Sequence, residues 1–350
     1  MKSLSSALPA VLVLAAPLAG IAQNHHKLQP NERELNIPGH TSIVSAPAGF
    51  DPLTASAEDL AYYGYPPAPN QNTEPKAYAT WANAMRASKT RVTPQLEQTS
   101  IMHGPNKAGK LSNPTAVESN AALKGQPTNT AYSYNWSGYV DFSGATSFGS
   151  KSYYFTVNDL VVPVAQQAGC DGGWDWGSSW NGIDGDGSND VLQAGIEFDA
   201  YCSGSTRSSY YSTWYEWAPY SEVRVPSVPI VPGDDIFIEV WDTSATSGHA
   251  YVVNKNTGLY FNVSFGPPPG YSLIGNSAEW VVERPTVNGA FATLTDYTMD
   301  PFWDAYGYTQ GYAVFNDIDE ATPIDMLTNS GALYSYPEYV GIEGFVGHYY

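Results

Sequence analysis

Residues 131–350 of the sequence predict an all-β fold, a sandwich or a barrel. Short runs of alternating apolar and polar residues recur throughout this part, and Gly, Pro, Asn and Asp separate them. No long stretch with helical periodicity interrupts these runs. Regularly spaced strand and turn signals of this kind are typical of sandwiches and barrels, and about 220 residues suffice for one such domain.

The predicted strands follow one another along the chain with short connections. They lie within residues 152–163, 190–200, 210–219, 234–243, 248–257, 259–265, 278–285 and 332–347. Three of them have one apolar face for a core and a second face that mixes carboxylates, an amide and tryptophan. The second faces carry Gln193, Glu197 and Asp199, then Trp214 and Glu216, and then Glu279 and Glu283. Such faces either contact water or line a site.

The N-terminus predicts export. Lys2 precedes the apolar run LPAVLVLAAPLAG, and the small residues Gly20 and Ala22 come just before Gln23. A charged start, a short apolar stretch and a small-residue exit are the parts of a secretory signal peptide, here residues 1–22. This run is too short to cross a bilayer, and no later segment is long enough. We therefore expect a secreted, extracellular protein that does not insert into a membrane.

Residues 23–130 have a different composition from the part that follows. They are rich in Pro, Asn and Ala, and one helix is predicted from about Ala77 to Lys89. We interpret them as a prosegment that precedes a domain at 131–350. The alternative is a retained, partly ordered extension.

Charge is distributed unevenly between these two parts. Residues 1–130 hold ten basic and eight acidic residues, whereas residues 131–350 hold five basic and 26 acidic ones. So many negative charges argue against a nucleic acid as partner, because nothing would neutralise its phosphates. Acid would relieve the self-repulsion of the second part, so an acidic working environment is expected.

The sequence contains two cysteines, Cys170 and Cys202. In an oxidising compartment they could pair, although two free thiols remain the alternative. A bridge would close a loop that contains Trp180, Asp184 and Gln193.

Familiar catalytic and metal-binding patterns are absent from the sequence of the predicted domain. His249 and His348 are its only histidines and lack metal-ligand spacing, and no G-x-S-x-G elbow occurs. The loop IDGDGSNDV around Asp184 resembles a calcium loop only weakly, since Gly and Glu are missing at its sixth and twelfth positions. We therefore expect no metal and no cofactor. What remains is a set of carboxylates and Gln193.

Four segments, YNWSGYV, SWNGIDGDGSNDVLQAGIEF, WYEWAP and AEWVVERP, resemble the signature blocks of the glutamic peptidases, or eqolisins, in order and spacing. The resemblance covers about residues 132–350. It implies a secreted, acid-acting endopeptidase with a removable prosegment. It also implies a two-sheet antiparallel β-sandwich, a lectin-like (concanavalin A-like) jelly roll.

By position, the family's catalytic pair corresponds to Gln193 and Glu279. The resemblance further implies roles in the substrate cleft for Trp180, Asp184, Glu197, Trp214 and Glu216. Glu197 and Ser212 both stand where the family usually has Asp, so the finer hydrogen bonding of the cleft differs from the usual pattern.

The chemistry suits these residue types. Glu279 as a carboxylate would take a proton from water, and the Gln193 amide would donate to the developing oxyanion. A glycoside hydrolase with paired carboxylates, or a non-catalytic lectin-like module, are the alternatives. For the peptidase we expect a monomer that acts on proteins or peptides and is inhibited by its own prosegment, through Lys and Arg of residues 76–124 paired with cleft carboxylates.

Overall fold

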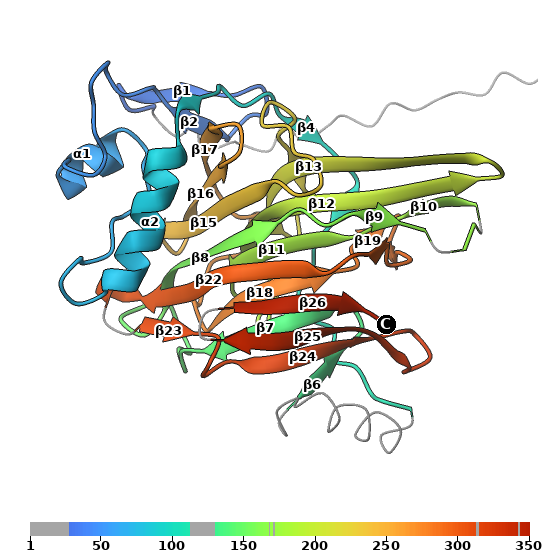
Figure 1. Cartoon of the computed structure of the whole chain (residues 1–350). Coiled ribbons are helices and arrows are strands. Elements are labelled where there is room, and N and C mark those ends of the chain that lie inside the picture. The colour runs from blue at the N-terminus through green and yellow to red at the C-terminus, as the bar shows by residue number, and fades with distance from the viewer. Residues whose placement is uncertain (1–27, 113–129, 168, 171, 313–314, 342–343) are drawn as a thin grey trace, which may run out of the picture.

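The computed structural model describes residues 28–112, 130–167, 169–170, 172–312, 315–341 and 344–350 (Figure 1). The predicted signal peptide lies outside the described residues. Within them, no helix has the length and apolar character that a membrane crossing requires.

Two antiparallel layers form the body of the fold. The first contains β13 (Thr206–Ala218), β12 (Val191–Ser203), β11 (Ser178–Ile183), β18 (Ser277–Glu283), β7 (Trp136–Phe142) and β24 (Thr322–Leu327), in that spatial order. The second contains β17 (Leu259–Phe265), β16 (Ser247–Asn254), β15 (Asp235–Ser244), β8 (Tyr153–Val161) and β22 (Asp300–Thr309). At one edge, β25 (Leu333–Gly341) and β26 (Gly344–Tyr349) connect β24 to β22. The predicted antiparallel β-sandwich is confirmed.

Short elements complete the described domain. They are β6 (Ala131–Ser133), β9 (Ala165–Gln166), β10 (Gly173–Asp175), β14 (Val223–Arg224), β19 (Thr286–Val287), β20 (Ala290–Phe291), β21 (Asp296–Tyr297), β23 (Phe315–Asp317) and a 3-10 turn at Gln310–Tyr312.

The core between the layers uses the apolar faces that alternation predicts. Leu192, Ala194, Ile196 and Phe198 of β12 are all buried in one cluster with residues of β15 and β16. The apolar sides of β13 and β18 belong to the same cluster. The opposite faces of these three strands therefore point out of the sandwich, where they can form a site.

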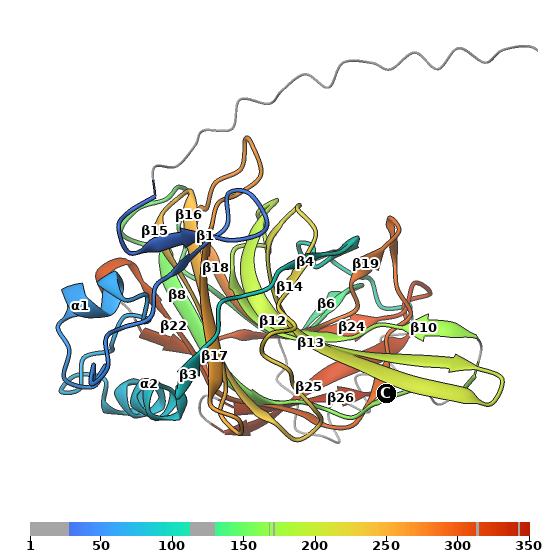
Figure 2. The same cartoon turned by 90° about the horizontal axis from the view of Figure 1, so that it is seen from above.

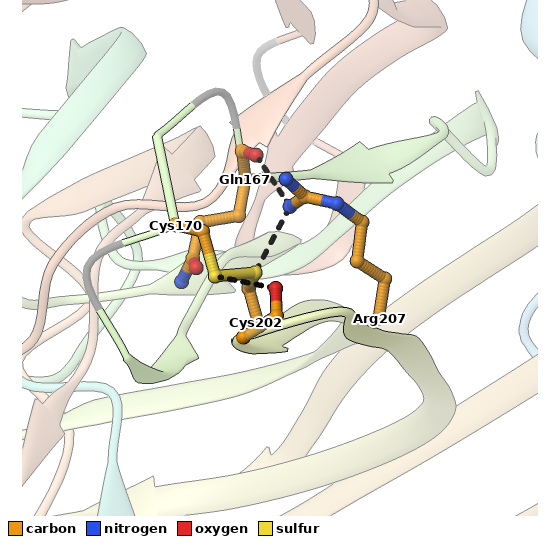
Figure 3. The surroundings of a disulfide bond; sticks show 5 residues. Gln167, Cys170, Cys202 and Arg207 are labelled. Atoms are coloured by element: carbon orange, nitrogen blue, oxygen red, sulfur yellow. Dashed lines mark hydrogen bonds between the residues drawn. A yellow bond between two sulfur atoms is a disulfide. The ribbon is translucent and has the colours of Figure 1, made fainter.

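A disulfide joins Cys170 to Cys202, whose Cα atoms lie 5.4 Å apart (Figure 3). The predicted pairing is confirmed. Arg207 lies beside it and donates from Nη1 to the backbone carbonyl of Gln167 over 3.3 Å. The bridge fixes the loop before β10 to the end of β12, the strand that carries Gln193.

Residues 28–112 wrap around both layers. Helices α1 (Ala57–Tyr62) and α2 (Pro75–Ala87) cover the outer face of the second layer, with Trp81 buried against its aromatic residues. Figure 2 shows these helices at one end of the molecule and β4 (Glu97–Gln98) farther along, close to β14. The predicted helix is confirmed, with its start shifted to Pro75, a residue that favours the first helical turn.

The same region contains short strands that its sequence did not indicate. They are β1 (Glu32–Glu34), β2 (Thr41–Ile43), β3 (Thr90–Arg91), β4 and β5 (Ile101–Met102). Strands β2 and β3 extend the second layer at β17, whereas β5 pairs with β19. These strands are two or three residues long, too short for an alternating pattern to show.

Candidate active site

The two predicted catalytic residues lie in one row across the first layer. Gly182 of β11 pairs directly with Gln193 of β12 on one side and with Glu279 of β18 on the other. Glu216 of β13 continues the row beyond Gln193. Residues paired directly across antiparallel strands point to the same face. Gln193 and Glu279 therefore face each other over a glycine, with their Cα atoms two strand spacings apart, roughly 9.5 Å.

The next row on this face carries the two predicted cleft tryptophans. Trp180 and Trp214 both pair with Gly195 of β12. A Cβ atom at Gly195 would lie 2.6 Å from Cβ of Trp180 and 2.8 Å from Cζ2 of Trp214. The glycine therefore lets the two indoles approach each other over the strand. They belong to a separate apolar cluster on the outer face of this layer.

Both members of the candidate pair are buried. Gln193 and Glu279 are each 0% exposed, and neither oxygen of Glu279 has a hydrogen-bond partner among the described residues. Burial raises the pKa of Glu279 well above its usual range. Burial thus favours the neutral form of Glu279 over its carboxylate.

The cover is the chain segment at residues 101–107, which runs over the row. The Gln193 side chain donates from Nε2 to the backbone carbonyl of His103 over 2.5 Å. The backbone N–H of His103 donates to the carboxyl oxygens of Glu216, at 3.1 and 3.0 Å. The indole N–H of Trp136 donates to the carbonyl of Gly104 over 3.1 Å. The site thus binds the backbone of an extended peptide.

The side chain of His103 also binds to this face. Its ring stacks on Trp214 with centroids 3.9 Å apart and planes inclined by 10°. Nε2 lies 2.9 Å from Glu222 Oε2, and Nδ1 lies 3.5 Å from Glu283 Oε2. Burial lowers the pKa of His103, but the two carboxylates raise it more, to about 10.

Two of the predicted cleft residues have partners within the domain. Asp184, at φ 69°, accepts hydrogen bonds from the backbone N–H groups of Ile274 and Asn276, so its carboxylate holds the loop before β18. Glu197 forms an ion pair with Arg224. No hydrogen bond or ion pair joins either side chain to the described covering segment.

The remaining predicted residues, Trp180, Trp214 and Glu216, do lie together with the pair. The candidate set omitted four residues that the structure adds to the site: Asn135, Trp136, Glu222 and Glu283. Glu283 shares the outward face of β18 with Glu279, and Asn135 and Trp136 lie in the YNWSGYV segment, so alternation and position could have found them. Glu222 lies in a connection with no periodic signal.

In the described part of the chain, no group of three or more His, Cys, Asp or Glu side chains is placed to hold a metal ion. His348 pairs with Glu338 at 2.7 Å, away from the row, and His249 lies on β16 in the second layer.

A β-sandwich with a glutamine and a glutamate opposed across one face corresponds to the class of glutamic endopeptidases. The model of the Peptidase A4 family matches residues 134–344, and the chain belongs to this family. It is therefore a peptide hydrolase, which favours the peptidase interpretation over the carbohydrate-active and lectin-like alternatives.

Similar proteins agree with this assignment. The chain is 30% identical to Aspergillopepsin-2 of Aspergillus niger over 219 residues, which are 59% of this chain and 74% of that protein. It is 33% identical to Scytalidopepsin B of Scytalidium lignicola over 165 residues, which are 47% of this chain and 58% of that protein. The structure of scytalido-glutamic peptidase with a transition state analog inhibitor superposes with a TM-score of 0.52 at 26% identity, covering 62% of this chain and 98% of that one.

Proposed function

We propose that this protein is a secreted acid endopeptidase that hydrolyses peptide bonds with Gln193 and Glu279. The observation that carries the proposal is the hydrogen bond from the Gln193 amide to the carbonyl of His103. A substrate carbonyl in that position would face Glu279 across Gly182.

In the proposed reaction, Glu279 as a carboxylate takes a proton from a water molecule while that water attacks the substrate carbonyl carbon. The side-chain N–H of Gln193 donates to the oxygen as it becomes negative. Glu279 then returns the proton to the leaving amine as the C–N bond breaks. An amide keeps its donor at every pH, whereas a histidine base would be protonated in acid.

Residues 23–130 act in this proposal as an inhibitory prosegment of the domain at 131–350. Residues 101–107 supply the contact, since they cover Gln193, Glu216 and Trp214. The charge that enters the cleft is that of His103. Among the described residues, no Lys or Arg between 76 and 110 forms an ion pair with a carboxylate of the domain, whereas His103 lies against Glu222 and Glu283. Lys124, the last residue of the expected basic set, lies outside the described residues.

The covering segment, residues 101–107, also affects Glu279, the proposed base. Burial raises the pKa of Glu279, so a covered Glu279 keeps its proton and cannot activate water. When the segment leaves and water enters, the pKa of Glu279 falls and the carboxylate forms. Removal of the prosegment therefore both opens the cleft and activates its base.

The test replaces each member of the pair with the other residue type. Full chain carrying Glu279→Gln should fold but cleave no peptide after incubation in acid, because an amide cannot act as a base. Gln193→Glu should lose about 10²–10³ in turnover, since an oxyanion donor is lost. Glu320→Gln, at an exposed position, is the matched control.

Cleavage of a denatured protein and of a polysaccharide at acid pH is measured for all four proteins. Near wild-type peptide turnover by Glu279→Gln would refute the catalytic assignment.

A further inference from the structure

The His103 side chain fills a closed pocket with three different walls. Trp214 covers one face of the ring at 3.9 Å, and the carboxylates of Glu222 and Glu283 lie against the two ring nitrogens at 2.9 and 3.5 Å. The side chains of His103, Glu222 and Glu283 are each at most 1% exposed. Nε2 is hydrogen-bonded to Glu222, whereas Nδ1 faces Glu283 at 3.5 Å without a hydrogen bond, so the two acidic groups flank the ring on opposite sides.

The domain itself holds these carboxylates in place. Arg224 lies with Nε 3.0 Å from Oε1 of Glu222. Trp180 donates from Nε1 to Oε2 of Glu283 over 2.9 Å, and Asn135 donates from Nδ2 to Oε1 of Glu283 over 3.1 Å. None of these three supporting side chains belongs to the covering segment. That segment does contact the backbone of Glu222, whose N–H donates to the carbonyl of Ile101 over 2.9 Å.

The position of this pocket relative to the reacting bond follows from the backbone. The carbonyl that accepts from Gln193 belongs to His103 itself. If Gln193 is the oxyanion donor, His103 occupies the place of the residue whose carbonyl is attacked. We propose that Trp214, Glu222 and Glu283 form a specificity subsite for a protonated imidazole, and that the enzyme prefers peptides with histidine immediately before the cleaved bond.

This inference rests on the proposed function of Gln193 and Glu279. Its selectivity has two physical sources. A phenylalanine would stack on Trp214 but leave Oε2 of Glu222 without the donor that His103 supplies. Sites built to bind a polar group discriminate strongly against analogues that lack it. A lysine would supply a positive charge but has no flat ring to stack on the Trp214 indole. Its one ammonium group would also have to serve both acidic side chains. Histidine stacks on Trp214 and places its two ring nitrogens beside Glu222 and Glu283.

The test uses full chain that has been incubated in acid, and four peptides. One is TSIMHGPNK, the sequence of residues 99–107, and the others replace its histidine with Phe, Leu or Lys. Mass spectrometry measures kcat/KM for the bond after the replaced position at pH 5, where the lowered pKa of Glu222 keeps its carboxylate ionised. We expect the histidine peptide to exceed each of the others by about tenfold or more.

Two variants locate the preference in the pocket. Glu222→Gln and Glu283→Gln should each reduce the ratio of His to Phe cleavage by about tenfold, and Glu320→Gln should not change it. The peptide comparison needs no variant, so it stands if a variant fails to fold.

Equal kcat/KM for the His, Phe and Leu peptides would overturn the subsite alone. An equally good Lys peptide would overturn its selectivity for imidazole. Failure to cleave any peptide or denatured protein would instead overturn the proposed function.

Discussion

Gly182 separates Gln193 from Glu279, the proposed catalytic pair. In the proposed mechanism, a peptide carbonyl and a water would lie over this glycine, which has no side chain to obstruct them. A Cβ atom at this position would lie 3.1 Å from Cβ of Gln193 and 3.1 Å from Cζ3 of Trp180. Both contacts are tight, and both neighbours are parts of the site.

We therefore expect Gly182→Ala to reduce peptide turnover by about 10²-fold, because displacements of about 1 Å in a catalytic arrangement have effects of that size. The loss should appear in kcat more than in unfolding free energy, which denaturant titration measures. Gly149→Ala is the control, since its added methyl would meet only a backbone oxygen at 4.0 Å. Full activity of Gly182→Ala would show that the gap is not needed.

At the scale of elements, residues 101–107 are the proposed latch, and the ion pair between His103 and Glu222 that holds it is buried. Burial raises the pKa of Glu222, but His103 and Arg224 lower it more, to below the ordinary value of 4.5. The attraction to His103 is therefore complete above about pH 4.5 and is lost as pH falls through the lowered pKa of Glu222. His103, with its pKa raised to about 10, stays charged throughout this range. Salt should weaken the latch little, because buried pairs are poorly screened.

His103→Gln removes the charge of the latch and should move self-processing of the full chain to higher pH. The matched control is Lys107→Gln, which removes a positive charge four residues away that forms no ion pair among the described residues. The measurement is the fraction of chain shortened after timed incubation between pH 3 and 6, with and without salt. Identical profiles for His103→Gln and wild type, or equal shifts for both variants, would rule out a histidine latch.

The disulfide fixes one end of β12, the strand that carries Gln193, the proposed oxyanion donor. Cys170 and Cys202 are 32 residues apart, and the loop they close contains β10, β11 and most of β12. Closing a loop of this length in the unfolded chain is worth about 3–4 kcal/mol. The double variant Cys170→Ser/Cys202→Ser should lose about that much unfolding free energy in urea at pH 6. Wild type titrated with a reductant should approach the variant, and equal stability of the oxidised and double-variant proteins would contradict this.

At the scale of the whole molecule, the sequence predicted the sandwich because period-two alternation records which strand face is buried. Leu192 and Trp280 lie in the core for that reason, and Gln193 and Glu279 lie outside it. The family resemblance selected the same pair. The latch could not be predicted, because His103 contacts Trp214, Glu222 and Glu283 through folding and no pattern within residues 101–107 indicates it. The local periodicity of a sequence does not determine which distant segments come into contact.

The whole molecule also buries many acidic groups, beyond those of the site. Burial raises the pKa of Asp159 and of Asp300 to about 7, of Asp190 to about 6 and of Asp242 to about 8. The ordinary value for these carboxyls is 3.8. The folded protein thus binds more protons than the unfolded chain between about pH 4 and 8. These four groups contribute stability that is fully present below their ordinary value and is lost as pH rises through 6 to 8.

We expect the unfolding free energy of full-length Glu279→Gln, which cannot process itself, to be higher at pH 5 than at pH 8. This window lies above the pH at which we expect the contact between His103 and Glu222 to weaken, so the proposed prosegment should stay bound at both pH values. Asp300 is fully buried and accepts a hydrogen bond from Ser179, so Asp300→Asn in the same background keeps the shape and removes the titrating group. The difference between pH 5 and pH 8 should then shrink by roughly 1–4 kcal/mol, at 1.4 kcal/mol per pKa unit. Urea titrations at the two pH values measure it, with Glu320→Gln as the exposed control. A stability that is constant or rises from pH 5 to pH 8 would mean that these buried carboxyls do not hold their protons, and acid preference would then have to arise in the site alone.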